Sequence, residues 1–474
     1  MPFSSYLFLF AFLPLVVLCF WVLPQGFVRL AFLTIASCVF YGFWDWRYIP
    51  LLLGATFVGW LAGHDIAAAE GGRRRKVVLV LALTLNVGIL AYFKYRGFFL
   101  DSLSGLFGLF GEPAPLPVVR VLLPLGISFY TFAAISYVID VYRGTIQPAR
   151  SIVYYWAYAT MFPYVTAGPI IRYGHVGRQL ERPQQRFHWA LVGSGLFFLI
   201  LGLAKKLLFA DMIAPFVNPL YLPGAQLTLI TGWAAALGYT LQLYFDFSGY
   251  SDMAVGAAFL LGVRFPQNFN SPYKAVNVSD FWRRWHMTLS SWLRDYLFIP
   301  LGGSREGQLR TIRNLLIVFL LGGLWHGPSW TFVIWGLLWG VYLSIHSVLR
   351  NRGLTPSWTW LNRLITFVCA VVAWVFFRAT SVDSALNVLK AMAGFSGVAG
   401  EGTGVARVFG TGAGQLAPVF AGLIVGGLLW VNLLPNTWQI RPAPKLRWVV
   451  VLGLLLAASL LAMSRPSAFL YLQF

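Results

Sequence analysis

Two histidines, His286 and His326, are the residues best suited to chemistry, because they lie in the polar strip of an otherwise apolar chain, residues 244–335. His326 interrupts LLGGLWHGPSW, where an ionisable side chain is costly unless it has a partner or a purpose. Imidazole has an unperturbed pKa of about 6.5 and therefore moves protons readily near neutral pH. Two imidazoles in a water-poor cavity can take a proton from an attacking hydroxyl and steady a reacting carbonyl, as acyl transfer requires. A buried histidine satisfied by its neighbours is the alternative for either residue alone.

Three further residues are candidates for supporting roles. Asp246 and Asp252 lie six residues apart in YFDFSGYSDM, and Trp325 directly precedes His326. The aspartates can orient an imidazole or satisfy buried donors, and the pattern does not distinguish these roles. The chain shows no HxxxH or HExxH spacing, so we expect no bound metal. It also lacks a GxSxG elbow and a Walker loop, so a serine hydrolase and an ATP-driven pump have no support.

The segment around His286 has the pattern of an amphipathic helix. On a helical wheel, residues 279–297 form one helix, with Ser279 or Asp280 available as its N-cap. The apolar face comprises Trp282, Trp285, Leu289, Trp292, Leu293, Tyr296 and Leu297, and the polar face comprises Arg283, Arg284, Ser291, Arg294 and Asp295. A helix of this kind usually lies at the headgroup boundary of a membrane. That role does not explain why the imidazole of His286 falls within the apolar arc.

The composition indicates an integral membrane protein. Of the 474 residues, 58% are hydrophobic and 11% charged, far below the roughly 25% charged residues of soluble domains. The net charge of +20 comes from Lys and Arg in short connections, where they act first as topology signals, so we expect no nucleic-acid partner. The three cysteines lie in apolar runs without paired spacing and are expected to pack in the core.

Apolar runs predict an all-α fold with about ten to thirteen membrane helices and one domain, residues 1–474. The runs lie near residues 6–24, 28–46, 48–68, 77–95, 120–141, 189–204, 225–245, 248–263, 312–326, 328–349, 360–378, 415–434 and 446–464. The basic stretch GGRRRK at 71–76 marks a cytoplasmic connection, which places the N-terminus outside. The N-terminal run lacks a basic region and a cleavage site, so we expect it to be a retained span.

Three segments depart from this pattern. Residues 98–119 are broken by Gly and Pro and predict a short interfacial helix with a loop. Residues 152–168 have basic residues on both sides, which favours a re-entrant segment over a crossing. Residues 394–414 form a Gly-rich connection.

The composite motifs resemble the membrane-bound O-acyltransferase (MBOAT) family, and within it the bacterial branch that acetylates polysaccharides. The strongest matches are YFDFSGYSDMA, FNSPY, FWRRWHMTLSSWLRDYLFIPLGG and GGLWHG, and weaker ones include LPLGISFYTF, FPYVTAGPIIR and the closing FLYLQF. The resemblance implies a ring of helices around a central tunnel, with re-entrant and interfacial helices. It places His326 at the family's catalytic histidine and His286 where relatives have a second His, Asn or Asp.

The resemblance also implies a donor, an acceptor and partners. The donor is a cytoplasmic thioester, either acetyl coenzyme A or an acylated phosphopantetheine carrier, with no permanently bound cofactor. Lys274, Arg283, Arg284 and Arg294 belong to a basic surplus that suits the donor's phosphates, although the surplus serves equally well as a topology signal. The acceptor is an exopolysaccharide such as alginate or cellulose, reached through periplasmic acetyltransferase partners from a bacterial inner membrane. The Gly-rich connection matches no member of the family closely.

Two alternatives stay open at this point. One is D-alanyl transfer from a carrier protein towards teichoic acid, which the same branch includes. The other is a channel or proton-coupled transporter whose polar strip lines a pathway. Transporters of this size often have two related halves, and no such repeat is visible, which favours the enzyme.

Overall fold

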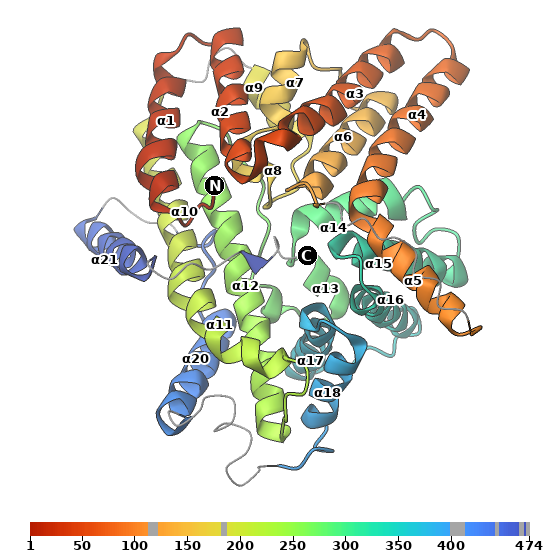
Figure 1. The fold of residues 1–474 in the computed structure, drawn as a ribbon, viewed down its shortest axis with the longest axis vertical. Helices are drawn as coiled ribbons and strands as arrows, with labels where there is room; N and C mark the ends of the chain where they lie inside the picture. The colour runs from red at the N-terminus through yellow and green to blue at the C-terminus, as the bar shows by residue number, and fades with distance from the viewer. Residues whose placement is uncertain (112–121, 182–186, 399–412, 441–444, 464–468, 471–474) are drawn as a thin grey trace. The chain divides into compact units, whose positions relative to one another are not determined.

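The computed structural model describes the chain except for residues 112–121, 182–186, 399–412, 441–444, 464–468 and 471–474 (Figure 1). Within the described residues every regular element is a helix, which confirms the predicted all-α class. The number of membrane crossings and the central tunnel remain predictions.

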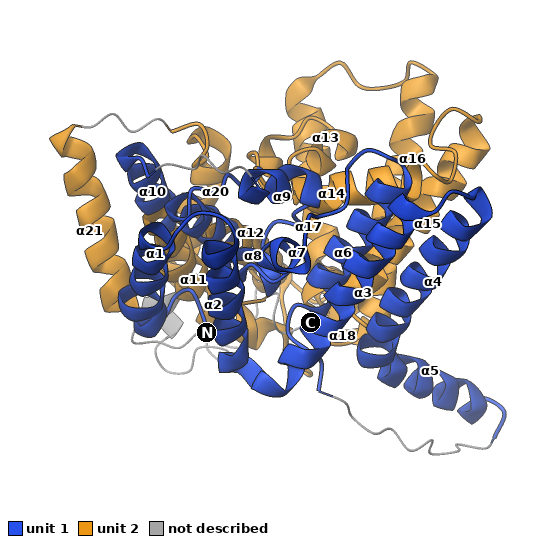
Figure 2. Ribbon diagram, turned by 90° about the horizontal axis from the view of Figure 1, so that it is seen from above, with its two compact units in different colours: residues 1–199, 251–266 blue, residues 200–250, 267–474 orange. Residues whose placement is uncertain are grey.

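The chain forms two compact units, coloured separately in Figure 2. Unit 1 contains Met1–Leu199 and Ser251–Pro266, and unit 2 contains Ile200–Tyr250 and Gln267–Phe474. The boundary between them falls inside two helices, α10 (Trp189–Lys205) and α12 (Leu229–Leu260). Whether the whole chain acts as the single domain expected from its composition remains a prediction.

Unit 1 holds the N-terminal helices, many of which pair as neighbours along the chain. They are η1 (Leu7–Phe12), α1 (Leu13–Val22), α2 (Phe27–Asp45), η2 (Trp46–Tyr48), α3 (Ile49–Ala68), α4 (Gly72–Leu90), η3 (Ala91–Tyr95), α5 (Arg96–Gly108), α6 (Ile127–Tyr142), α7 (Ile152–Ala159), α8 (Phe162–Val165), α9 (Tyr173–Glu181) and most of α10. Helix α6 is buried along most of its length among these helices.

Unit 2 holds both candidate histidines. Its further helices are η4 (Lys206–Ala210), α11 (Asp211–Val217), η5 (Asn218–Tyr221), most of α12, η6 (Pro272–Lys274), α13 (Val278–Trp282), α14 (Met287–Leu293), η7 (Arg294–Phe298), α15 (Gln308–His326), α16 (Trp330–Asn351), α17 (Thr359–Arg378), α18 (Val382–Met392), α20 (Ala413–Leu433) and α21 (Leu446–Ala462).

Four helical stretches of the described residues are long and apolar enough to cross a membrane: Phe27–Ala68, Gly72–Gly108, Trp330–Asn351 and Thr359–Arg378. Shorter apolar helices cover Leu7–Val22, Ile127–Tyr142, Ala417–Leu433 and Leu446–Ala462. Large apolar side chains are exposed along these helices, as membrane helices require, because their solvent is hydrocarbon.

Two predicted spans prove to be one helix. Runs 225–245 and 248–263 were predicted as two separate apolar runs, yet α12 is continuous for 32 residues across both. The buried carboxylate of Asp246, which lies at the junction of the two runs, pairs with Nζ of Lys206, so the helix accommodates it without a break.

The irregular segments agree in part with their predictions. Residues 152–168 form two short helices, α7 and α8, and no helix long enough to cross a membrane. Helix α5 is the short helix expected at the start of 98–119, and most of the loop that follows lies outside the described residues. Most of the Gly-rich connection at 394–414 also lies outside them.

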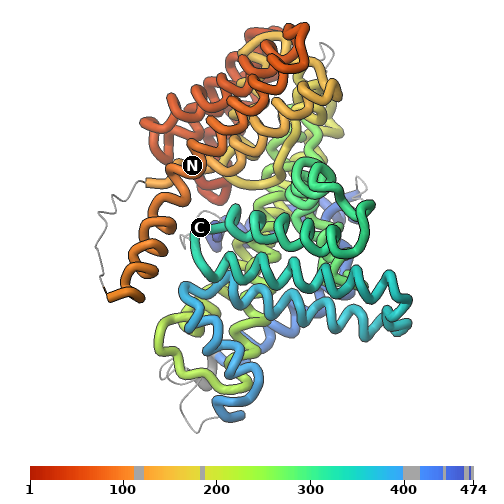
Figure 3. Tube along the Cα trace, turned by 90° about the vertical axis from the view of Figure 1, so that its right-hand side faces the viewer, coloured from red at the N-terminus to blue at the C-terminus, as the bar shows by residue number. Residues whose placement is uncertain are grey.

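Helices α15 and α16 pack against each other closely enough that backbone meets backbone (teal in Figure 3). Gly323 and Gly336 face each other at the crossing. A methyl group on Gly323 would overlap the carbonyl oxygen of Phe332, and one on Gly336 would overlap that of Phe319. Because His326 ends α15 one turn after Gly323, this approach fixes the position of its imidazole.

Substituting Gly336→Ala should therefore destabilise unit 2. The added methyl has to push two backbones apart, which typically costs about 1–3 kcal/mol. Gly422→Ala is the matched control, because nothing lies within 4 Å of a Cβ at this α20 position. Thermal unfolding in detergent should show a lower midpoint for the first variant only. Equal midpoints would contradict the close approach.

Candidate active site

His286 lies in a tight turn between α13 and α14. Its backbone is left-handed, with φ 42° and ψ 53°, a conformation that side chains other than Gly and Asn seldom adopt. The predicted continuous helix 279–297 is therefore wrong, since the chain turns at residues 283–286 and restarts at Met287. The N-cap is Asn277, whose side chain accepts the N–H of Asp280, and neither Ser279 nor Asp280 takes that role.

The predicted apolar face is nevertheless buried. Trp282, Trp285, Leu289, Trp292, Leu293 and Tyr296 are all buried, and Leu297 is half-buried. The imidazole of His286 has an exposed fraction of 0%, so it points inward as the wheel predicts.

Asn268 holds this turn with its side-chain oxygen, Oδ1. This oxygen accepts the backbone N–H of Thr288 at 3.3 Å and the hydroxyl of Thr288 at 2.8 Å. It lies 3.1 Å from Nδ1 of His286. The backbone carbonyl of Asn268 also accepts the N–H of Met287, at 2.9 Å. An unusual backbone conformation persists where surrounding bonds over-determine it, and these bonds do so.

The same bonds fix the proton on the imidazole. A backbone N–H can only donate, so the Asn268 atom that it meets must be the oxygen. Nδ1 of His286 must then carry the hydrogen, and in the neutral ring Nε2 keeps the lone pair. Burial favours this neutral form and lowers the pKa of His286 to about 3. At pH 7 His286 is therefore a neutral imidazole whose Nε2 accepts hydrogen bonds.

Trp325 is a ring neighbour of both candidate imidazoles. Its ring is 6.2 Å from that of His286 and 4.9 Å from that of His326, between ring centroids. Phe247 covers His286 edge-on at 4.7 Å, and Trp335 and Phe377 lie 4.8 and 5.0 Å from His326. The structure thus gives both histidines one common neighbour in a dry aromatic setting. That they line one chamber remains a prediction.

A layer of tryptophans surrounds this pair. Trp335 stacks near Trp374 at 5.9 Å, and Trp374 lies 4.7 Å from Trp285. Trp282 lies 5.9 Å from Trp335. These rings come from α13, α16, α17 and the His286 turn, so the aromatic layer packs those elements together around the buried imidazoles.

The carboxylate of Asp246 pairs with a buried cation. Its carboxylate is 2.6 Å from Nζ of Lys206 and accepts the backbone N–H of Leu470 at 3.0 Å. Lys206 also pairs with Asp211, at 2.7 Å. Of the two roles left open from sequence, the donor-satisfying role is therefore the one observed. Asp252 is buried in the part of α12 that belongs to unit 1.

The four basic residues expected at the donor have different surroundings. Arg284 pairs with Asp280 at 3.0 Å, and Arg294 pairs with Asp295 at 2.7 Å. Lys274 donates to the carbonyl of Leu434 at 2.7 Å, and Arg283 is exposed. Burial, and then the charges of Arg363 and Arg284, lower the pKa of Lys274, so these three cations share one positive field.

Sequence reasoning missed Asn268 and Lys206. Asn268 directly precedes FNSPY, residues 269–273, a motif quoted for its resemblance alone, and Lys206 follows an apolar run. A buried lysine next to hydrophobic sequence signals a carboxylate partner, which is the signal that could have revealed Lys206. Within the described residues no group of three His, Cys, Asp or Glu side chains is arranged to hold a metal ion.

Comparison with known proteins shows the family. Residues 149–385 match the model of MBOAT, the membrane-bound O-acyltransferase family. A probable alginate O-acetylase AlgI from Azotobacter vinelandii is 41% identical over 83% of this chain and 78% of its own length. A peptidoglycan O-acetyltransferase from Helicobacter pylori is 39% identical over 84% of this chain and 80% of its own length. A probable alginate O-acetylase AlgI from Pseudomonas putida is 37% identical over the full length of both.

The chain therefore belongs to the membrane-bound O-acyltransferase family, as the motifs indicated. It is an O-acyltransferase, and with its apolar helices it is a multi-pass membrane protein. A teichoic acid D-alanyltransferase from Bacillus subtilis is a more distant relative, 28% identical over 58% of this chain.

The burial of His286 predicts a pH dependence of stability. In the unfolded chain this imidazole takes up a proton near pH 6.5, whereas in the folded chain it does so near pH 3. The unfolded state therefore binds more protons in this window, and the free energy of unfolding falls as pH falls from 6.5 towards 3. His286→Asn keeps a residue that tolerates left-handed backbone and removes the titration. As pH falls from 6.5 towards 3, the thermal unfolding midpoint of this variant should decline less steeply than that of the wild type. Equal dependence of the two midpoints on pH would contradict the burial of His286.

The ion pair of Asp246 predicts a large loss of stability on substitution. Asp246→Asn removes one of two carboxylates from a buried lysine, and breaking a buried pair typically costs about 3–5 kcal/mol. Asp295→Asn is the control, because its partner Arg294 is exposed and such pairs are worth about 0–1 kcal/mol. Thermal unfolding in detergent measures both. A wild-type midpoint for Asp246→Asn would show that the pair contributes nothing.

Proposed function

We propose that this chain transfers an acetyl group from a thioester donor to hydroxyls of an exopolysaccharide of the alginate or cellulose type. The relatives named for alginate and peptidoglycan O-acetylation support this choice, since they match most of the chain at 37–41% identity. The observation that carries the proposal is the pair of buried imidazoles, His286 and His326, which share Trp325 as a ring neighbour. Membership in an acyltransferase family favours this enzyme over a channel or transporter.

The proposed reaction uses His326 as general base. Its imidazole takes the proton from the acceptor hydroxyl as the oxygen attacks the thioester carbonyl carbon. The new C–O bond forms, the C–S bond breaks, and the departing thiolate takes up the proton from His326. The tryptophan layer keeps water away, so the polysaccharide hydroxyl rather than water attacks.

The role of His286 follows from its tautomer. An imidazole beside the base can act in two ways, by positioning the acyl group or by polarising its carbonyl. Polarising a carbonyl needs a donor, but the hydrogen on Nδ1 is committed to Asn268 and Nε2 carries the lone pair. This arrangement supports positioning, in which Nε2 accepts a hydrogen bond from an N–H or O–H of a bound substrate.

The donor, its direction and the partners complete the proposal. Acetyl coenzyme A or an acylated phosphopantetheine carrier approaches from the cytoplasm, and the field of Lys274, Arg284 and Arg363 attracts its phosphates. Arg294 contributes to the same surplus of positive charge, although Asp295 balances it locally. We place the chain in a bacterial inner membrane with its N-terminus outside, handing acetyl groups to periplasmic acetyltransferase partners, because GGRRRK marks the cytoplasmic side.

Substituting His326→Ala should abolish acetyl transfer while the protein remains in the membrane. Removing a general base typically costs a factor of about 10²–10⁴ in rate. Membranes carrying the chain are incubated with labelled acetyl coenzyme A and an oligosaccharide acceptor, and label in the acceptor is counted. His188→Ala is the control, since His188 is exposed at the start of α10. If His326→Ala transfers acetyl groups at the wild-type rate, His326 is not the general base. If wild-type protein transfers D-alanine and not acetyl, the proposed donor group is wrong.

A further inference from the structure

A cavity of about 640 Å³ lies between α16, α17 and the segment that leads into α13, away from both imidazoles' aromatic contacts. One face of α16 and one face of α17 form its walls, and all of its lining belongs to unit 2. The lining includes Tyr342, Ile345, His346, Leu349 and Arg350 of α16 and Thr359, Asn362, Ile365, Thr366 and Cys369 of α17. Within the described part of the chain, Arg283 is the one lining residue that lies in a quoted family motif and among the basic residues expected at the donor, and the proposed reaction uses no other part of this cavity.

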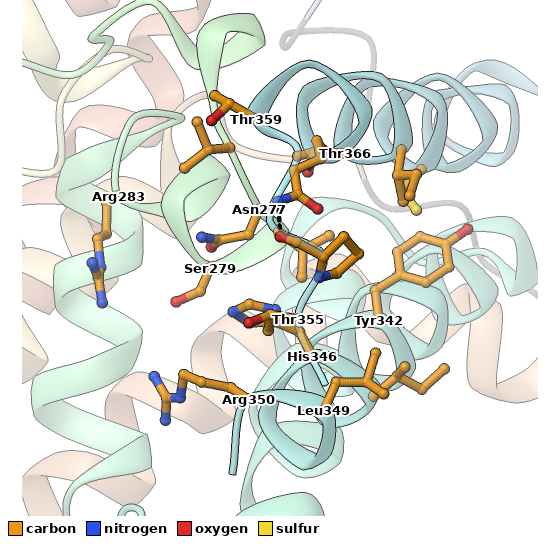
Figure 4. A pocket seen from close by; sticks show the side chains of 17 residues that line it. Asn277, Ser279, Arg283, Tyr342, His346, Leu349, Arg350, Thr355, Thr359 and Thr366 are labelled. Atoms are coloured by element: carbon orange, nitrogen blue, oxygen red, sulfur yellow. Dashed lines mark hydrogen bonds between the residues drawn. The ribbon is translucent and has the colours of Figure 1, made fainter. Parts of the chain in front are cut away.

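The polar side of the cavity is cationic. Arg283 and Arg350 line the cavity and are exposed. His346, which also lines it, is half-buried. Figure 4 shows the polar ends of Arg283, Ser279, His346 and Arg350 gathered on one side, with Tyr342 on the opposite side. The described residues that line the cavity include no carboxylate. Two guanidinium groups without a carboxylate suit a phosphate, whose oxygens accept their paired N–H donors.

The other side of the cavity is apolar and continues onto the outer surface of membrane helices. Ile345 and Ile365 line the cavity and are themselves exposed, on two helices that are long and apolar enough to span. A water-soluble ligand has no need of such walls, whereas acyl chains pack against them.

Aromatic and basic residues place the cavity's mouth at a membrane surface. Trp358 and Trp360 are exposed at the N-terminal end of α17, with ring centroids 6.3 Å apart and nearly parallel planes. Exposed tryptophans next to a span mark the headgroup level, and Arg350 and Arg352 favour the cytoplasmic leaflet. Basic pockets between membrane helices at this level bind anionic lipid headgroups.

We propose that this cavity binds an anionic glycerophospholipid, with its phosphate between Arg283 and Arg350 and its acyl chains along α16 and α17. A lipid bound there contacts residues of α13, α16 and α17 at the same time. These are the elements that also carry the tryptophan layer, so its binding stabilises unit 2. This proposal is independent of the acyl-transfer chemistry.

The test uses purified, delipidated full-length protein in detergent. Phosphatidylglycerol or phosphatidylcholine with identical acyl chains is added, and bound lipid is counted by native mass spectrometry alongside the thermal unfolding midpoint. Wild-type protein should retain phosphatidylglycerol in preference to phosphatidylcholine and unfold at a higher temperature with it. Since a basic residue near an anionic headgroup contributes about fivefold in affinity, Arg283→Gln with Arg350→Gln should weaken phosphatidylglycerol binding about 25-fold.

Matched variants keep the test decisive. Arg352→Gln removes the same charge two residues beyond Arg350, outside the lining, and should bind phosphatidylglycerol like wild type. If the double variant does not fold, Arg350→Gln alone is used, with a fivefold loss expected for an exposed residue in the last turn of α16. Equal retention of the two lipids, or unchanged binding by the variants, would overturn the proposal. Arginine-dependent stabilisation by coenzyme A but not by phosphatidylglycerol would overturn it in favour of the donor.

Discussion

The hydrogen bonds to one amide oxygen, Oδ1 of Asn268, determine the geometry of the candidate active site. They hold the turn at residues 284–288, keep His286 in a left-handed conformation and select its tautomer. Without them, the wheel of residues 279–297 could continue as one helix and the imidazole would have no fixed hydrogen. Backbone conformations that are unfavourable for the residue type are common at functional sites, and the left-handed conformation of His286 is consistent with its candidate role.

The second constraint is that charge and polarity must be satisfied inside apolar helices. Lys206 pairs with both Asp211 and Asp246, and the backbone N–H of Leu470 donates to Asp246. Phe469 stacks on Tyr250 at 4.3 Å, one turn along α12 from Asp246. Phe469 and Leu470 thereby contact the same helix whose Phe247 covers His286. Support of the site thus extends from η4 to the end of the described chain.

Much of this could be predicted from the sequence, because the dominant signals are local. The apolar runs predicted most of the helices. The helical period of about 3.6 residues also identified the buried face around His286, although the helix predicted at 279–297 is interrupted there. The break depends on Asn268, 18 residues earlier, and the continuity of α12 depends on Lys206. The Leu470 contact spans 224 residues. Such partners meet only through the fold, so no local pattern in one sequence reports them. The cavity beside His346 arises in the same way, from α16, α17 and a loop far apart in the chain.

The central claim is that His286 and His326 act on one reaction as a unit, and a double-mutant cycle tests it most directly. Rates of acetyl transfer are measured for purified wild type, His286→Asn, His326→Ala and the double variant. Residues that act on the same reacting groups are strongly non-additive. The account predicts that the double variant is no slower than His326→Ala beyond a small factor. Multiplication of the two single losses would show that the imidazoles act independently and would contradict a shared site.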